Sequence, residues 1–239
     1  MDNDQLVAIV TGAGSGIGRE TAILLAKAGY RVSLVGRRKN KLLETQEDID
    51  GGANDGAAVM HVAADISDSA SAATIVDRTL EAWGRVDVLV NNAAVSPMQP
   101  IEETNDDLLQ QCFAVNTFGP MRLVARLWPT FVRQSGGCVV NVSTMATVDP
   151  FPGLSVYGAS KAALESLTRS IVNEGRMMGI RAYSIVPGAV ETAMLRSLWN
   201  EDDVPPERVL TPVQVAQVVV ACVKGEREAD TGMTIRLVA

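Results

Sequence analysis

The segment that most constrains the fold is the glycine-rich turn Thr11–Gly18, which reads Thr-Gly-Ala-Gly-Ser-Gly-Ile-Gly. It follows the apolar run 6–10, which is typical of a buried parallel strand, and an amphipathic helix is expected directly after it, to about Ala28. Glycines let the backbone approach a phosphate, while the free amides and dipole of a helix N-terminus favour negative charge. The segment therefore predicts an anion-binding turn between a strand and a helix.

The spacing of the glycines distinguishes this turn from two better-known ones. It is not a P-loop, because no Gly-Lys-Ser/Thr follows it. It also departs from G-x-G-x-x-G, since Ile17 stands where the third glycine would fall, counted from Gly12. The pattern that fits is T-G-x-x-x-G-x-G.

Strands and helices alternate along the rest of the chain without a linker or an internal repeat. This alternation predicts an α/β fold: one doubly wound parallel sheet of the Rossmann type, with helices on both faces, spanning 1–239 as a single catalytic domain. A kink is expected near Asn116 and Gly119-Pro120, Ser67 is the expected N-cap of its helix, and 51–56 is an expected flexible connection. The expected strands are 31–35, 57–63, 86–90, 138–142, 181–186 and 234–238; the expected helices are 40–50, 67–83, 106–133, 157–178 and one starting at 211–212.

Composition narrows the class of partner. The net charge of −7 argues against nucleic acid or an anionic membrane as the main partner. The acidic start, 1–5, lacks a secretion signal and no apolar run is long enough to span a bilayer, so a cytoplasmic location is expected. The cysteines 112, 138 and 222 are scattered, which favours small buried residues over disulfides or a metal site. His61 is the single histidine, so a Ser-His-Asp triad is not favoured.

Tyr157 and Lys161 are four residues apart and share one face of the predicted helix 157–178. An isolated Y-x-x-x-K is more often a surface tyrosine and a solvated lysine, but here it follows an anion-binding turn. Lowering a tyrosine pKa from about 10 by roughly three units requires about 4 kcal/mol, the order of energy that a cation at ~4 Å supplies at an effective dielectric constant of about 20. The pair therefore predicts a proton donor and acceptor, with Lys161 lowering the pKa of Tyr157.

The end of the second predicted strand bears on the choice of dinucleotide. In a dinucleotide-binding fold a carboxylate there binds the ribose 2′-hydroxyl, whereas arginine suits a 2′-phosphate. Here the position is Gly36, followed by Arg37 and Arg38. NADP(H) is therefore favoured over NAD(H), the alternative being a solvated arginine pair in a loop.

These pieces, in this order and over nearly the whole chain, resemble the short-chain dehydrogenase/reductase family. The resemblance implies an oxidoreductase in which Asn116, Tyr157 and Lys161 are catalytic and a hydroxyl before them completes the set. It also implies a cofactor-binding set: Gly12, Ser15, Gly16, Ile17 and Gly18 in the pyrophosphate loop; Arg37 and Arg38; Asp65 and Ile66 at adenine; Asn92, Ala93 and Ala94 after the fourth strand; Tyr157 and Lys161; and Pro187, Gly188, Val190 and Thr192 at the nicotinamide.

Three positions depart from the family pattern. Ala94 replaces the glycine of Asn-Asn-Ala-Gly, and Leu237-Val238-Ala239 replaces a common C-terminal ending that helps to build tetramers. The place of the usual catalytic serine is held by Thr144, with Ser143 just before it. Threonine carries the same hydroxyl donor, and strand alternation aims one of the two at the cleft, with Thr144 favoured.

The resemblance gives the expected reaction. Hydride passes between NADP(H) and a carbonyl or alcohol, Tyr157 transfers the proton, Thr144 or Ser143 polarises the oxygen, and Asn116 holds a water in the proton path. The substrate is expected to be a small, largely apolar molecule, bound under 145–155 and 189–207. The expected pocket residues are Met145, Phe151, Leu154, Met194, Leu195, Leu198 and Trp199, with Arg196 as a cation.

Two alternatives remain open. A 3-oxoacyl carrier-protein reductase would use basic residues such as Arg133 and Arg176 to meet its acidic carrier, although Met178 stands where such enzymes often have arginine. A non-catalytic dinucleotide-binding regulator would keep the glycine turn, but loss of Tyr157 or Lys161 would be expected of it, and both are present. A homodimer or homotetramer built on helices 106–133 and 157–178 is expected from the resemblance.

Overall fold

A single parallel sheet carries the fold. The computed structural model describes residues 5–52 and 58–239, and in it seven strands lie in the order β3-β2-β1-β4-β5-β6-β7, each paired in parallel with its neighbours. The predicted doubly wound Rossmann-type fold is confirmed. The strands are β1 (Val7–Thr11), β2 (Arg31–Gly36), β3 (Val59–Ala63), β4 (Val88–Asn91), β5 (Gly137–Val142), β6 (Ile180–Pro187) and β7 (Thr234–Leu237).

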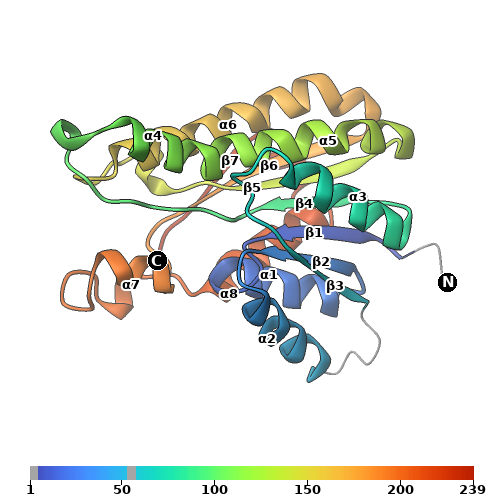
Figure 1. Ribbon diagram of the computed structural model, residues 1–239, viewed down its shortest axis with the longest axis horizontal. Coiled ribbons are helices and arrows are strands. Elements are labelled where there is room, and N and C mark those ends of the chain that lie inside the picture. The colour runs from blue at the N-terminus through green and yellow to red at the C-terminus, as the bar shows by residue number, and fades with distance from the viewer. Residues whose placement is uncertain (1–4, 53–57) are drawn as a thin grey trace.

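Helices cover both faces of the sheet (Figure 1). Each face has its own apolar core, because the inward side chains of a strand alternate between the two layers: Val90 and Val140 belong to one core, Leu89 and Val139 to the other. One layer holds α1 (Gly16–Lys27), α2 (Lys39–Asp50) and α8 (Pro212–Val223); the other holds α3 (Ser71–Trp83), α4 (Asp106–Phe113), α5 (Gly119–Gln134) and α6 (Ser155–Gly175).

The structure corrects three local expectations. The helix expected over 106–133 is interrupted by a π-helical segment, Ala114–Phe118, at the place where a kink was predicted. Ser67 is not a helix N-cap: α3 begins at Ser71, and Ser67 instead donates to Asp65 through its amide and its hydroxyl. A short helix, α7 (Ala193–Leu198), was not anticipated. Most of the expected flexible connection 51–56 lies outside the described residues.

The Thr11 hydroxyl joins the glycine turn to the neighbouring strand. Thr11 Oγ1 donates to the carbonyl of Val90 (3.1 Å) and accepts from the amides of Asn92 (2.9 Å) and Ala93 (3.1 Å). These amides lie just beyond β4, where the sheet no longer supplies partners. One buried side chain therefore fixes the loop after β4 against the turn after β1.

A row of polar side chains crosses the sheet beneath α6. Asn91, Asn141, Ser184 and Thr234 are successive register partners on β4, β5, β6 and β7. Asn91 donates to Asn141 (2.9 Å), and Asn141 donates to Thr168 of α6 (2.9 Å). Because Asn141 and Thr168 are both buried, a displacement of α6 would leave the Asn141 amide without this acceptor.

Replacing Thr11 by valine is expected to destabilise the protein by about 2–4 kcal/mol, because two partly buried amides lose their acceptor, each at the lower end of the roughly 1–3 kcal/mol that a buried group costs. Urea denaturation measures the change, and Thr11→Ser, which keeps the hydroxyl, is the control and should recover most of the loss. A Thr11→Val variant as stable as the wild type would contradict the role assigned to this hydroxyl.

Candidate active site

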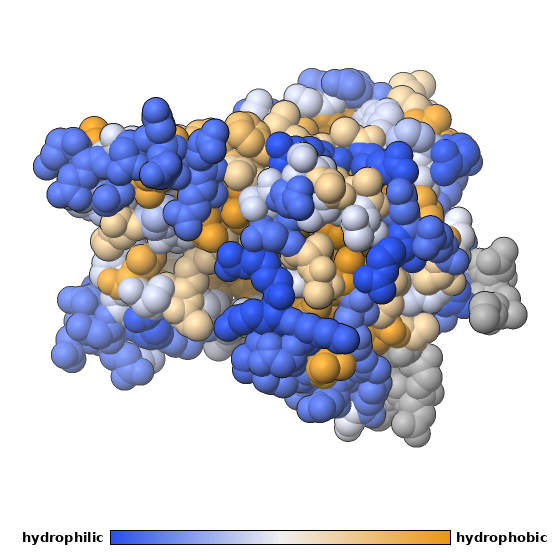
Figure 2. Space-filling model, in the orientation of Figure 1, coloured by the Kyte–Doolittle hydropathy of each residue, from blue (hydrophilic) through white to orange (hydrophobic). Residues whose placement is uncertain are grey.

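A long cavity of about 900 Å³ runs along the carboxyl ends of the strands. It extends from the glycine turn, past the ends of β4, β5 and β6, to α7 and the loop that follows it. In Figure 2 the side of the molecule near α7 is hollowed, with hydrophilic residues above and below the hollow and paler, less polar residues inside it. The volume lies within the range of about 300–1,000 Å³ that is usual for ligand sites.

The glycine turn has the geometry of an anion site. Gly12 and Gly16 have positive φ angles of 68° and 54°, and a Cβ on Gly18 would lie 2.4 Å from the carbonyl oxygen of Gly12. At the N-terminus of α1 the Ser15 side chain makes no capping hydrogen bond, and the first turn holds no acidic residue. The first amides of α1 are therefore available to a phosphate, and the residues present fit the pyrophosphate of a dinucleotide.

The adenosine end of the cavity is bordered by three cations. Arg37, Arg38 and Lys41 all line it. Arg37 is largely exposed and lies 3.8 Å from the carboxylate of Asp65. Burial raises the pKa of Asp65, but the hydrogen bonds from Ser67 and the charge of Arg37 outweigh it, so the pKa is lowered overall. Asp65 is thus ionised near neutral pH and partly neutralises Arg37.

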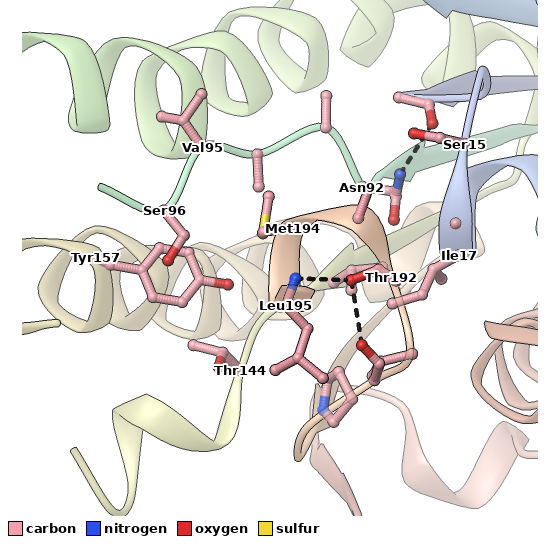
Figure 3. A pocket seen from close by; sticks show the side chains of 18 of the residues that line it. Ser15, Ile17, Asn92, Val95, Ser96, Thr144, Tyr157, Thr192, Met194 and Leu195 are labelled. Carbon is pink, nitrogen blue, oxygen red and sulfur yellow. Dashed lines mark hydrogen bonds between the residues drawn. The ribbon is translucent and has the colours of Figure 1, made fainter. Parts of the chain in front are cut away.

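Tyr157 and Thr144 lie near each other in the cavity, where β5 ends and α6 begins. The Tyr157 ring projects from the first turn of α6, and Thr144 stands at the end of β5 (Figure 3). The Thr144 hydroxyl lies close enough to the Tyr157 phenol to act on its pKa, which it lowers. Ser143, by contrast, donates to Glu165 (2.9 Å) and to the carbonyl of Lys161 (3.4 Å), so its hydroxyl is occupied away from Tyr157. Strand alternation thus places the Thr144 hydroxyl beside the tyrosine.

Lys161 is almost completely buried, with 1% of its surface exposed, and its Nζ donates to the carbonyl of Val142 (2.7 Å). Burial lowers the pKa of Lys161 to about 8. Burial likewise raises the pKa of Tyr157 to about 12, although the Thr144 hydroxyl acts in the opposite direction. The expected lowering of the Tyr157 pKa by Lys161 is wrong for this structure, because burial is the largest cause and raises that pKa, while Lys161 is not among the groups that act on it.

Asn116 lies in the π-helical segment and is fully buried. Its side chain accepts from the amide of Val95 (2.9 Å) and donates to the carbonyl of the same residue (2.9 Å). It also donates to Ser160 of α6 (3.0 Å) and to the sulfur of Cys112 (3.3 Å). These contacts occupy the amide, which therefore positions the loop after β4 against α6 and is not aimed into the cavity.

The far end of the cavity is mainly apolar and lies between α7 and the loop after β5. Met194 and Leu195 are seen on the α7 side in Figure 3. Arg196 was expected to line this end, but it does not. Its guanidinium pairs with Glu191 and donates to the carbonyls of Asn200 (3.1 Å) and Val204 (2.8 Å). The Arg196 guanidinium thus binds the backbone of the segment after α7 instead of facing the cavity.

The cavity brings together most of the residues that the sequence singled out. Of that set, Gly18, Asn116 and Arg196 do not line it. Sequence reasoning missed several lining residues, among them Lys41, Ser96, Asp149, Asp203 and Arg208. Lys41 alone had a detectable signal, since it lies one helical turn after Arg38.

The described residues, 5–52 and 58–239, hold neither a membrane-spanning helix nor a cluster of metal ligands. None of the helices there combines the length and apolar character that crossing a bilayer requires. Nor does that part of the chain bring three or more histidine, cysteine or acidic side chains together as a potential metal site. All three cysteines are unpaired and buried.

Comparison with known proteins gives a consistent result. The family model for short chain dehydrogenases matches residues 6–203. The chain is 37% identical to 2,3-dihydro-2,3-dihydroxybenzoate dehydrogenase of Escherichia coli, over 84% of this chain and 75% of that one. It is 36% identical to carbonyl reductase [NADPH] 2 of Sus scrofa, over 85% and 79%. The structure of 3-ketoacyl-(acyl-carrier-protein) reductase from Brucella melitensis with NADH aligns with a TM-score of 0.89 at 29% identity, over 98% and 96%.

The raised pKa predicts that Tyr157 stays protonated well above neutral pH in the protein alone. A difference between the near-ultraviolet spectra of wild type and Tyr157→Phe isolates this phenol from the other two tyrosines. Between about pH 9 and pH 11 the difference should show little phenolate, although a free tyrosine titrates near pH 10. A phenolate band already present near pH 8 would contradict the assigned direction.

Proposed function

Because the chain belongs to the short-chain dehydrogenase/reductase family, and is thus an oxidoreductase acting on C=O or CH–OH groups, we propose that it transfers hydride between NADP(H) and a largely apolar carbonyl or alcohol. The observation that carries the proposal is the Tyr157–Thr144 hydroxyl pair, which lies in the cavity one helical turn from the buried Lys161. The dinucleotide supplies the hydride when bound; the remaining work falls to side chains of this chain.

Tyr157 is proposed as the general acid in the direction of reduction. Since burial raises its pKa to about 12, it holds its proton at neutral pH, which is the state needed to protonate a developing alkoxide. Thr144 is proposed to share the binding of the substrate oxygen, because its hydroxyl already lies close to that of Tyr157. Two donors converging on one oxygen stabilise the negative charge that develops there.

Lys161 is proposed to support the site by placing a positive charge in it and by contacting the nicotinamide ribose. Its pKa of about 8 leaves it mostly protonated at neutral pH, even though it is buried. The Val142 carbonyl holds the ammonium at the end of β5, next to the strand residues that lead to Thr144. Above about pH 8 the ammonium loses its proton, so its support should weaken as pH rises through that value.

Replacing Tyr157 by phenylalanine should lower kcat by roughly 10²–10⁴, the usual contribution of a general acid, while leaving the affinity for the dinucleotide nearly unchanged. Phenylalanine keeps the ring and removes only the transferable proton. Steady-state kinetics with a ketone panel, together with fluorescence titration of NADPH, measures both quantities. A variant that retains most of its turnover would remove Tyr157 from proton transfer.

The preference for NADP(H) is proposed from the charges at the end of β2. Gly36 offers no carboxylate to repel a 2′-phosphate, and Arg37, Arg38 and Lys41 border that part of the cavity. Arg37 is the best placed for a two-pronged contact, since it is exposed and its contact with Asp65 is long, at 3.8 Å. Relatives are named with either dinucleotide, NADPH in the porcine enzyme and NADH in the Brucella structure.

Arg37→Ala is expected to remove most of this preference. One charge-assisted hydrogen bond contributes about 1.5–3 kcal/mol, so the wild type should bind NADPH roughly tenfold to a hundredfold more tightly than the variant does. Affinity for NADH should change little, which makes NADH the internal control. Binding titrations with both dinucleotides decide the matter, and a wild type that binds NADH as tightly as NADPH would show that the arginines are a solvated loop.

A 3-oxoacyl carrier-protein reductase remains the second candidate, favoured by the likeness to the Brucella structure. Two observations weigh against it. Arg133 and Arg176, the basic residues expected to receive an acidic carrier, do not line the cavity, whereas the exposed carboxylates of Asp149 and Asp203 do. A non-catalytic regulator is disfavoured by the presence of Tyr157, Lys161 and a free cavity together, and would be supported by tight NADPH binding without turnover of any ketone, aldehyde or alcohol.

Assembly and location stay predictions. Leu109, Phe118, Met121 and Val132 are exposed apolar side chains on α4, α5 and the segment between them. They accord with the expected homodimer or homotetramer, in which such side chains would be covered. The cytoplasmic location likewise rests on the sequence.

A further inference from the structure

The outer end of the cavity is crossed by two aromatic rings, one from each wall. Phe151 belongs to the loop after β5, and Trp199 follows directly on the last residue of α7. Their ring centroids are 5.8 Å apart and the rings are tilted by 55°. Both side chains line the cavity, and Phe151 is 56% exposed, so the contact reaches the surface of the molecule at this end.

The loop that carries Phe151 is fixed by its own backbone contacts. The carbonyl of Phe151 accepts from the amide of Leu154 (3.1 Å), which is a buried residue. The carbonyl of Gly153 accepts from the amide of Gln99 (2.9 Å), which joins this loop to the segment after β4. Phe151 is therefore exposed without being on a free loop.

The segment that carries Trp199 is fixed independently. The Trp199 amide donates to the carbonyl of Leu195 (2.9 Å), the last turn of α7. Arg196 joins Glu191, before α7, to the carbonyls of Asn200 and Val204, after it. A guanidinium with this many partners holds both sides of α7 in one arrangement, so the position of Trp199 does not depend on its contact with Phe151.

We propose that Phe151 and Trp199 form an outer wall of the substrate compartment and make the enzyme selective for compact carbonyl compounds and alcohols, whose carbon skeleton ends before the two rings. The proposal rests on the proposed function, because it assumes that the reacting oxygen binds at Tyr157 and Thr144. The cavity of about 900 Å³ has to contain the dinucleotide as well as the substrate, so the substrate compartment is only a part of it.

A series of straight-chain 2-alkanones locates such a wall. In an open apolar groove each added methylene should raise kcat/KM by roughly fourfold, the effect of burying one CH₂ group. Against a wall the increase stops at the length that reaches the rings, and longer ketones lose activity because they have to displace an aromatic side chain. The chain length at which the increase stops thus measures where the compartment ends.

The experiment compares wild type with Trp199→Ala, Phe151→Ala and the double variant, each loaded with NADPH, on 2-butanone to 2-dodecanone. We expect the wild type to reach its maximum at a short ketone and both single variants to shift it to longer ones. On the longest ketones each should gain roughly tenfold or more in kcat/KM, equivalent to about two further methylenes. The double variant should gain little beyond the better single variant, since removing either ring opens the same wall.

Val148→Ala is the matched control. Val148 is an exposed apolar residue of the same loop as Phe151, but it does not line the cavity. Its chain-length profile should match that of the wild type. Trp199→Leu serves if Trp199→Ala does not fold, because leucine still shortens the side chain enough to open the wall.

The results separate this inference from the proposed function. Turnover by the wild type that rises without a break up to the longest ketones, or an equal shift in Val148→Ala, overturns the wall and leaves the oxidoreductase intact. Absence of turnover for every carbonyl and alcohol refutes the proposed function instead. In that case calorimetric titration of the same ketones into the NADPH-loaded proteins measures the length limit directly, and equal limits in wild type and variants overturn the wall.

Discussion

The buried amide of Asn116 holds together segments that line the cavity at the carboxyl edge of the sheet. Its two-way contact with the backbone of Val95 fixes the loop after β4, and its contact with Ser160 fixes α6. A regular helix would place this position differently, which gives a physical reason for the π-helical segment 114–118. Because a buried amide without partners is costly, each of these segments is in place only when the others are.

The parts of the site that could be predicted from the sequence are those set by local geometry. The glycine turn between β1 and α1 follows from residue spacing, because only glycine tolerates the positive φ angles and the close approach of Gly18 to Gly12. The pairing of Tyr157 with Lys161 on one helix face follows from the helical repeat. The parallel sheet follows from the alternation of elements. None of these depends on knowing how distant segments pack.

What the sequence did not reveal depends on which of several possible partners a polar side chain takes, and on how deeply a group is buried. Ser67 is of a residue type that often caps helices, but its hydroxyl donates to Asp65 instead. The sequence allows both contacts and does not show which of them forms. Arg196 was placed in the pocket because of its neighbours in sequence, yet Glu191 and two carbonyls draw it away. The direction of the Tyr157 pKa shift was missed for a related reason: helical spacing indicates a nearby charge but not how thoroughly the phenol is desolvated.

The polar row beneath α6 makes the two walls of the cavity unequal. Moving α6 by one turn would displace Thr168 from Asn141 by about 5.4 Å and leave the buried Asn141 amide without its acceptor. This helix therefore has a single stable register. The opposite wall, α7 and the residues after it, is secured chiefly by surface groups around Arg196. Mutations there can reshape the compartment at little cost to the fold. The side chains that α6 brings to the cavity, Tyr157 and Lys161, are by contrast held in one position. New substrate preferences in such a chain should therefore arise by divergence of residues 193–204 while its chemistry stays the same.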